Sequence, residues 1–348
     1  MVLPWVPVRQ WVLTVPYRLR YRMAFDHGLS RAVLGVFTRV LLDGYARDAR
    51  ARSIDGGRTG TVTALQRGGG GLNTNLHFHT LVLDGVFREA NAGGLAFHPA
   101  PGPSDDEVAE ILALIRDQVG RLLHRRGLAP EDDATGPADP LGEESPLLAG
   151  IVSASVQGRV ALGGRAGRRV RRLGEEAEAE GVMSRGPRQA HLDGFDLHAN
   201  VWVGANDRAG LERLCRYVLR PPFAQERLRL RADGRVGLEL KRAWHDGTRE
   251  LVFEPLEFLE RLAAMTPRPE TNLLICHGLL APRASWRERV IAYGRVEPPL
   301  TASAAPMVAG PDSAREKSPP RGWTWAALMH RAFAIDVLAC PLCGAGYA

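Results

Sequence analysis

Two stretches of the chain place apolar residues at the spacing of an amphipathic helix. In residues 28–50 the apolar positions recur every three or four residues: Leu29, Ala32, Val33, Val36, Val40 and Leu41. This period puts them on one face of a helix. Residues 104–127 show a similar pattern, and they open with Ser104, Asp105 and further acidic residues. Such residues cap a helix N-terminus and suit its dipole. We predict a helix in each stretch.

Short runs rich in Val, Leu and Thr predict strands. Residues 9–17 form one such run, which Pro16 ends. The segments "GTVTALQRGG" and "NTNLHFHTLVLDG" flank the glycine loop 68–71, a pattern typical of a hairpin. We expect further strands near residues 94–97 and over 193–205.

The second half of the chain alternates helical and β patterns. The expected elements are a helix over 206–222, a β-meander over 226–253 that turns at Asp233-Gly234, a helix over 255–265 and a strand over 271–277. Hairpins dominate throughout. The sequence therefore predicts an α+β fold, in which helices pack on an antiparallel sheet and a smaller meander and helix follow.

Two polar stretches are predicted to lack regular structure. Residues 128–149 are rich in Pro, Asp and Gly, which is typical of a surface loop. Residues 163–181 hold a basic block followed by an acidic block, and we expect them to be exposed and mobile.

Composition and charge narrow the class of protein only a little. The formal charge of +6 and the pI of about 9.5 favour a polyanionic partner. However, Lys241 and Lys317 are the only lysines, so the arginine content indicates a GC-rich genome as much as a function. No apolar run reaches the roughly 18 residues of a membrane span, and the first residues lack a signal-peptide pattern. We expect a cytoplasmic protein with no membrane partner. The four cysteines are too scattered for a disulfide framework.

Two histidines interrupt an apolar strand. His77 and His79 are two residues apart, so they project from the same face of the strand "NLHFHTLVL". Two adjacent imidazoles on a rigid strand can bind one divalent cation. The alternative is a pair of hydrogen-bonded histidines on a half-buried strand. A third metal ligand would come from a neighbouring element, and Gln66 is the candidate, with Asn75 behind it.

The helix predicted over 206–222 has an apolar face and a basic face. The apolar stripe comprises Leu211, Leu214, Cys215 and Val218, whereas a different face carries Arg213, Arg216, Tyr217 and Arg220. A tyrosine among arginines suits a nucleophile that faces phosphate, because cations stabilise the phenolate and attract a phosphodiester. The other interpretation is an amphipathic tyrosine at the edge of the core, with solvated arginines.

Together these segments resemble the HUH endonucleases, and within them the rolling-circle transposases of the insertion sequence 91 type. The segments that carry the likeness, in the expected order, are "VPVRQWVLTVPYRLRY", "NLHFHTLVLDGVF", "LERLCRYVLRPP", "ELKRAWHDGTRELVFEPLEFLERLAA" and "CHGLLAPRASWR". The likeness extends over roughly residues 4–344.

The resemblance implies a transposase that nicks and joins DNA. His77, His79 and Gln66 would hold Mg²⁺ or Mn²⁺, and Tyr217 would form a 5′-phosphotyrosine with single-stranded DNA at the transposon ends and the target. Arg220 would assist the tyrosine or bind phosphate, and Arg213 and Arg216 would bind DNA.

Two departures from that family are visible in the sequence. Many relatives carry a second tyrosine four residues before the first, where this chain has Arg213, so we expect a single-tyrosine variant. Relatives also usually begin with a cysteine-rich zinc-binding segment ahead of "VPVRQW", which this sequence lacks, so we expect a truncated or mis-started copy.

The expected domain organisation follows the same likeness. Residues 1–225 form the HUH-type catalytic domain, 226–297 the meander and helical extension, 298–321 a Pro/Ala/Ser linker and 322–348 a C-terminal helix. That last segment ends in "CPLCG", where Cys340 and Cys343 have the spacing of half a zinc knuckle and could hold Zn²⁺ with distant ligands.

Two rival functions stay open at this stage. A catalytically inactive, truncated transposase would bind DNA without forming an adduct. A metal-dependent hydrolase would use His77 and His79 with an activated water, and it would not need Tyr217.

Overall fold

The computed structural model describes residues 3–90, 93–128, 139–174, 186–269 and 271–295. The chain divides into two compact units, Met1–Val296 and Glu297–Ala348. The second unit, with the predicted linker, the C-terminal helix and Cys340 and Cys343, lies outside the described residues. All that follows concerns the first unit.

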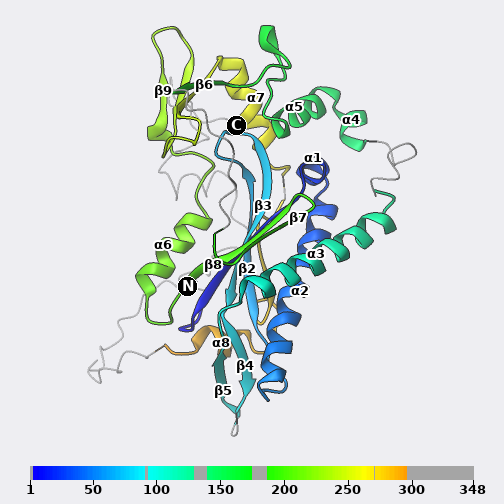
Figure 1. The fold of residues 1–348 in the computed structure, drawn as a ribbon, viewed down its shortest axis with the longest axis vertical. Coiled ribbons are helices and arrows are strands. Elements are labelled where there is room, and N and C mark those ends of the chain that lie inside the picture. Colours follow the sequence, from blue (N-terminus) through cyan, green and yellow to red (C-terminus); the bar gives the residue numbers. More distant parts are fainter. Residues whose placement is uncertain (1–2, 91–92, 129–138, 175–185, 270, 296–348) are drawn as a thin grey trace, which may run out of the picture. The chain divides into compact units, whose positions relative to one another are not determined.

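A six-stranded antiparallel sheet forms the centre of this unit (Figure 1). Its order is β12 (Leu274–Gly278), β2 (Gly60–Gly68), β3 (Thr74–Leu83), β1 (Val8–Thr14), β8 (Phe195–Val203) and β7 (Gln189–Leu192). The predicted glycine loop joins β2 and β3 in a hairpin. Strand β1 pairs with β3 on one side and with β8 on the other.

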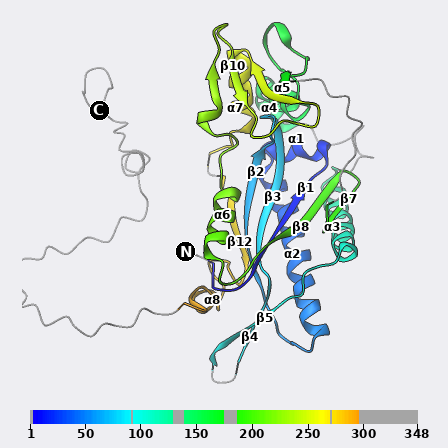
Figure 2. The same cartoon turned by 60° about the vertical axis from the view of Figure 1, so that its left-hand side comes forward.

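Three helices cover one face of the sheet (Figure 2). They are α1 (Tyr17–Phe25), α2 (His27–Ala51) and α3 (Asp105–Arg125). The predicted cap at Ser104 is present at the start of α3, where it forms a capping box with Glu107. Strand residues of one parity, such as Trp11, Phe78 and Leu197, are buried in the same core cluster as residues of α2 and α3. This cluster is the main hydrophobic core.

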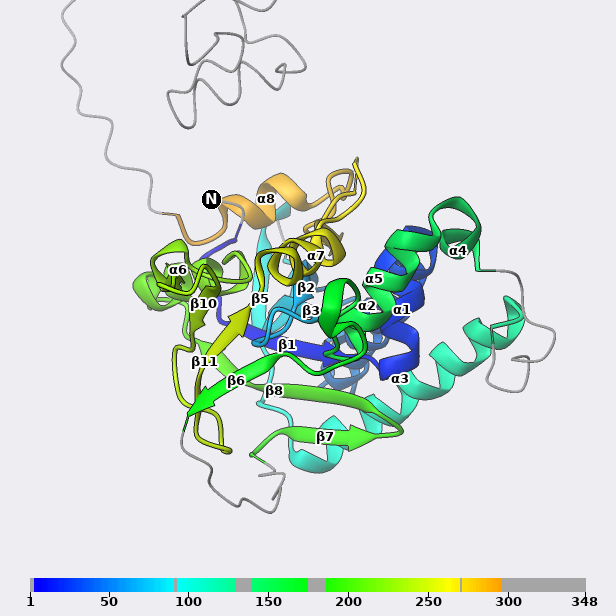
Figure 3. The ribbon, with the colours of Figure 1, turned by 90° about the horizontal axis from the view of Figure 1, so that it is seen from above.

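The opposite face carries a shorter helix layer. Figure 3 shows α6 (Arg208–Val218) across the sheet from α2 and α3, and α8 (Arg287–Ala292) lies near the paired strands β4 (Gly85–Glu89) and β5 (Leu95–Pro99). Strand residues of the other parity, including Val8, Leu81 and Leu83, pack with Leu211 and Leu214 of α6 in a second core cluster. The histidines belong to this second face.

A second, four-stranded sheet follows the order β6 (Arg171–Gly174), β11 (Thr248–Phe253), β10 (Val236–Glu239) and β9 (Leu228–Leu230). The accompanying helices are α4 (Pro140–Glu144), α5 (Pro146–Val156) and α7 (Pro255–Met265), with single 3₁₀ turns at Gly163–Arg165 and Gln225–Arg227. Leu238, Leu251 and Phe253 are the centre of a third core cluster.

The α+β fold class and most predicted elements are confirmed. The helix over 255–265 matches α7, the turn at Asp233-Gly234 separates β9 from β10, and the other helices and strands predicted within the described residues are found with shifts of a few residues at their ends. The helix α1 and the strand β7 were not predicted. The domain boundary after residue 225 stays a prediction.

Two predictions about loops are wrong. Residues 140–144 and 146–156 are helical, because Pro140 and Pro146 occupy the first helical turn and Ile151 and Val152 are buried. Residues 171–174, expected to be exposed and mobile, pair with β11 as β6. Residues 175–185 of that stretch lie outside the described part of the chain.

None of the helices in the described part of the chain is both long and apolar enough to cross a membrane.

Candidate active site

The register of the β2–β3 hairpin brings three predicted metal ligands onto one face. Gln66 pairs with His77, and Ala64 pairs with His79. Directly opposed residues in an antiparallel pair project to the same side, so Gln66 lies beside the histidines. The two imidazole centroids are 4.8 Å apart. The sheet therefore places His77, His79 and Gln66 together, as the sequence predicted.

The hydrogen bond of His77 determines its tautomer. The ring atom Nδ1 lies 2.8 Å from the backbone carbonyl of Asn75. A carbonyl can only accept, so Nδ1 carries the proton and Nε2 keeps a free lone pair. Metal-binding histidines have this arrangement, in which one ring nitrogen donates to a carbonyl and the other binds the ion.

His79 is held by a residue that the sequence analysis missed. The side-chain amide of Gln10, on β1, lies 2.7 Å from Nδ1 of His79. The atom nearest the ring is the amide nitrogen, which donates to Nδ1 and leaves the ring proton on Nε2. With the amide turned by 180°, its oxygen would accept from Nδ1 and Nε2 would be free for a metal. Gln10 is a polar residue in the apolar run "RQWVLTVP", and that contrast was the available signal.

Burial keeps both histidines neutral. Burial is the main cause that lowers the pKa of His77, and its hydrogen bond to Asn75 only partly opposes the effect. The pKa of His79 falls to about 3, first because of burial and then because His77 and Arg220 lie near it. A neutral imidazole is the form that binds metals.

Tyr217 reaches the same place from α6. Asp207 caps this helix by accepting from the Gly210 amide at 2.7 Å, and Leu211, Leu214 and Val218 form its buried stripe. Tyr217 lies off that stripe and is 42% exposed. Its ring stands edge-on to His79, with centroids 5.7 Å apart and an interplanar angle of 84°. The aromatic ring of Tyr217 and the two imidazoles therefore lie side by side.

The C-terminal end of α6 is bonded to the histidine strands. The Gln66 amide donates to the carbonyl of Val218 at 2.7 Å, which leaves the Gln66 oxygen available as a metal ligand. The guanidinium carbon of Arg220 lies 4.3 Å from the centroid of the Tyr217 ring. Gln66 and Arg220 thus connect the sheet, the end of the helix and the tyrosine.

The other two predicted DNA contacts differ from each other. Arg213 and Arg216 are both exposed on α6. Arg216 donates to Glu212 at 2.7 Å, one turn earlier on the same helix. Within the described residues, Arg213 has no such carboxylate partner.

Within the part of the chain that the structure describes, no carboxylate completes the candidate metal site. The described residues contain no group of three His, Cys, Asp or Glu side chains that could hold a metal ion. An ion at His77 and His79 would therefore depend on the Gln66 oxygen and on ligands from the substrate. Cys215 and Cys276 are free, half-buried thiols in the second core cluster and do not join this site.

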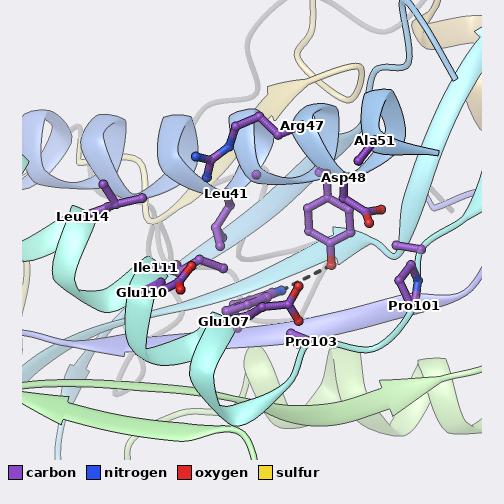
Figure 4. Close-up of a pocket in the computed structure, with 14 residues that line it drawn as sticks. Leu41, Arg47, Asp48, Ala51, Pro101, Pro103, Glu107, Glu110, Ile111 and Leu114 are labelled. Atoms are coloured by element: carbon purple, nitrogen blue, oxygen red, sulfur yellow. Dashed lines mark hydrogen bonds between the residues drawn. The ribbon is translucent and has the colours of Figure 1, made fainter. Parts of the chain in front are cut away.

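A separate cavity lies on the opposite face of the sheet. It has a volume of about 440 Å³ and is enclosed mainly by α2 and α3 (Figure 4). The indole of Trp11 donates to the hydroxyl of Tyr45 at 3.4 Å beside it. Trp11 and His79 face opposite sides of the sheet, so this cavity is not part of the histidine site.

The fold and this geometry define an α+β protein whose antiparallel sheet presents two neutral histidines to a helical tyrosine. A family model described as "Putative transposase" matches residues 60–288, which include β2, β3 and α6. The chain therefore belongs to this transposase family. No curated protein and no solved structure matches the chain.

Proposed function

We propose that this transposase nicks single-stranded DNA and transfers the strand through a 5′-phosphotyrosine on Tyr217. One observation carries the proposal: Tyr217 stands 5.7 Å, centroid to centroid, from His79, although the two residues come from different elements far apart in the sequence. If Tyr217 only packed against the core, there would be no need for two neutral histidines that can bind a metal beside it.

The donor set fits a divalent cation such as Mg²⁺ or Mn²⁺. Nε2 of His77 and the oxygen of Gln66 would hold it, together with Nε2 of His79 once the Gln10 amide is turned so that its oxygen accepts from Nδ1. When bound, the ion supplies Lewis-acid stabilisation of the charge on the scissile phosphate. Because these ligands are all neutral, the phosphate itself would supply the compensating negative charge.

The nucleophile and its surroundings come from α6. The Tyr217 oxygen attacks phosphorus, the bond from phosphorus to the 3′ oxygen breaks, and the phenolic proton is lost while the leaving oxygen gains one as a 3′-OH. Arg220, stacked on the Tyr217 ring, stabilises the negative charge that develops on the phenolic oxygen. One phosphodiester replaces another, so the reverse attack by a 3′-OH joins the strand elsewhere.

A covalent-capture experiment tests the proposal. The purified protein is incubated with a pool of single-stranded oligonucleotides and Mn²⁺, and a denaturing gel separates covalent adducts. We expect an adduct band that is lost with Tyr217→Phe, with the double variant His77→Ala/His79→Ala and with EDTA.

Tyr293→Phe is the matched control, because Tyr293 packs on Phe87 near the β4–β5 pair, outside the proposed site. This variant should form the adduct as the unaltered chain does. EDTA-sensitive cleavage that survives Tyr217→Phe would replace the proposal with the hydrolase. DNA binding without adduct or cleavage would replace it with an inactive, DNA-binding transposase.

A further inference from the structure

A cavity of about 400 Å³ lies at the tip of the β2–β3 hairpin. Gly70, Gly71 and Asn73 of the glycine loop form one wall, the end of α5 forms a second, and β6 and β11 of the second sheet form a third. Asn73 directly precedes β3, and His77 lies four residues further along the chain. At about 3.4 Å per residue, Asn73 is roughly 14 Å from His77 along the strand.

The indole of Trp244 lines this cavity from a tight turn. Its backbone N–H donates to the carbonyl of Thr248 at 2.9 Å, and its own carbonyl accepts from the N–H of Gly247 at 3.0 Å. The guanidinium carbon of Arg172 lies 4.8 Å from the ring centroid of Trp244, and Arg172 is bonded in turn to Asp246 at 2.8 Å. The indole is therefore held in place by its own turn and by β6, before any ligand binds.

The glycine loop leaves room beside this ring. A Cβ atom at Gly71 would lie only 3.3 Å from Cη2 of Trp244, which is slightly inside ordinary van der Waals contact. Glycine thus allows the loop to approach the indole without a side chain between them. Two side-chain amides, those of Asn73 and Gln157, complete the wall. An amide has both donors and an acceptor, so it can bind the edge of a base.

The rim of the cavity is cationic. Its members are Arg168, Arg169, Lys241 and Arg242, each within three residues of the cavity wall, and all four are exposed. Within the described residues no carboxylate forms an ion pair with any of them. Proteins that bind single-stranded nucleic acid combine such a cationic groove with aromatic rings on which bases stack.

We propose that this cavity binds one nucleobase of the DNA strand, stacked on the indole of Trp244 and at most about four nucleotides from the phosphate that Tyr217 attacks. The inference rests on the proposed function, because single-stranded DNA is taken to be the ligand. About four nucleotides, at 3.4 Å each, span the distance from Asn73 to His77 in a stacked strand, and an extended strand needs fewer. The cationic rim would hold the phosphates on either side of the base.

A base in this cavity would fix the register of the strand. A strand held only through its phosphates can slide by one nucleotide, because every phosphate is alike, whereas a seated base determines which bond reaches Tyr217. Trp244 is therefore a positioning residue. The rival explanation is structural: Trp244 also packs at the margin of the third core cluster, beside Leu251, and would serve that core alone.

The test locates the base on the DNA. The parent is the tightest-binding oligonucleotide of the pool, and each member of a set derived from it lacks one base at a different position. Fluorescence anisotropy measures the affinities in the Tyr217→Phe background, which cannot form the adduct. We expect one position at which the missing base weakens binding about fivefold or more, the low end for a base stacked on an aromatic ring. With Trp244→Leu that loss should disappear, whereas Trp244→Phe, which keeps a ring, should retain most of it.

Trp286→Ala is the matched control. Trp286 is also half-buried, and the guanidinium carbon of Arg58 lies 4.9 Å from its ring centroid, but it lies beside α8, at the other end of this unit from β6 (Figure 1). This variant should leave the positional loss unchanged. Thermal melting establishes that each variant is folded. If Trp244→Leu does not fold, Gly71→Ala replaces it, because its methyl group would narrow the cavity at the ring edge and reduce the same loss.

The cationic rim is tested by the salt dependence of binding. The double variant Arg168→Gln/Arg169→Gln should reduce the slope of log affinity against log salt concentration by about 0.7 for each phosphate contact that is lost. Arg229→Gln is its control and should leave the slope unchanged, since Arg229 is exposed on β9 and already paired with Glu239 at 2.9 Å.

Three results would overturn the inference: no position whose loss depends on Trp244, the same dependence on Trp286, or an unchanged salt slope in the double variant. These results are distinct from a failure of the proposed nicking. A positional loss in a protein that forms no Tyr217 adduct would support the base site and contradict the nicking chemistry, and an adduct without any position that depends on Trp244 would do the reverse.

Discussion

At the scale of single residues, the two histidines are prepared for a metal by their surroundings. The backbone carbonyl of Asn75 fixes the tautomer of His77, and the amide of Gln10 orients His79. Burial lowers both pKa values, so neither ring needs to lose a proton before it binds an ion. An exposed pair of histidines on a surface strand would have none of these three properties.

The lowered pKa values predict how metal affinity depends on pH. An ordinary histidine, with a pKa near 6.5, is about 90% protonated at pH 5.5. At that pH an exposed pair would therefore lose about tenfold in metal affinity for each ring. Because burial brings the pKa of His79 to about 3 and also lowers that of His77, protons should compete less in this range than they would at an exposed pair. We expect Mn²⁺ affinity, measured by titration calorimetry, to change less than about threefold between pH 7.5 and 5.5.

The double variant His77→Ala/His79→Ala serves as the blank for this titration and should bind no Mn²⁺ at the site. A tenfold weakening for each pH unit below 6.5 would show that the histidines are not neutral in the folded protein and would contradict the prediction.

At the scale of elements, α6 shows what the sequence pattern predicted and what it could not predict. The spacing correctly separated the apolar stripe of α6 from its basic face. It could not show that Tyr217 faces His79, because that contact depends on how the end of α6 is bonded to β2 through Gln66 and Val218. Long-range hydrogen bonds of this kind leave no periodic trace in the sequence.

The two arginines of the basic face should contribute unequally to DNA binding. Arg213 is free of a carboxylate partner within the described residues, whereas Arg216 is already paired with Glu212. We expect Arg213→Gln to weaken single-strand binding about three- to tenfold and to reduce the salt slope by about 0.7, and Arg216→Gln to change affinity less than twofold. Fluorescence anisotropy at several salt concentrations measures both, and equal effects would show that the pairing of Arg216 is irrelevant.

Two of the elements that the sequence analysis missed have different causes. Residues 140–149 were assigned to a loop on their Pro, Asp and Gly content, yet a proline in the first turn favours a helix. The strand β6 consists largely of arginines and carries no apolar alternation. It forms because β11 offers it an edge, and Arg172 is bonded to Asp246 at 2.8 Å beyond that edge. The helices thus had a local signal in the sequence, whereas tertiary context decided the strand.

At the scale of the whole molecule, the order of the strands in the central sheet could not be predicted from the sequence. The β2–β3 hairpin was predictable from its glycine loop, but the insertion of β1 between β3 and β8 and the position of β12 at the edge were not. That order matters for the site, because β1 supplies Gln10 to His79. The candidate residues were thus visible in the sequence, and their assembly was not.

A buried ionic network joins the central sheet to its helix layer. Arg9 of β1 donates twice to Asp84, at 3.0 and 2.9 Å, and the hydroxyl of Tyr45 on α2 donates to the same carboxylate at 2.7 Å. Arg9 and Asp84 are only 5% and 2% exposed. Burial, followed by the charge of Asp84, raises the pKa of Tyr45 well above its ordinary value, so Tyr45 remains a donor. The carboxylate of Asp84 therefore holds β1 and α2 together through its hydrogen bonds to Arg9 and Tyr45.

Asp84→Asn should therefore destabilise the fold without altering the chemistry. The change keeps the volume but leaves the Arg9 charge buried without its partner, which costs about 3 kcal/mol. The exposed pair of Asp48 and Arg52 on α2 is the control, and Asp48→Asn should cost about 0.5 kcal/mol or less. Urea unfolding measures both losses. Arg9 faces α2 while its neighbour Gln10 faces His79, so folded Asp84→Asn protein should form the Tyr217 adduct at the unaltered rate. Similar losses for the two variants would show that the buried network adds no more than a surface pair.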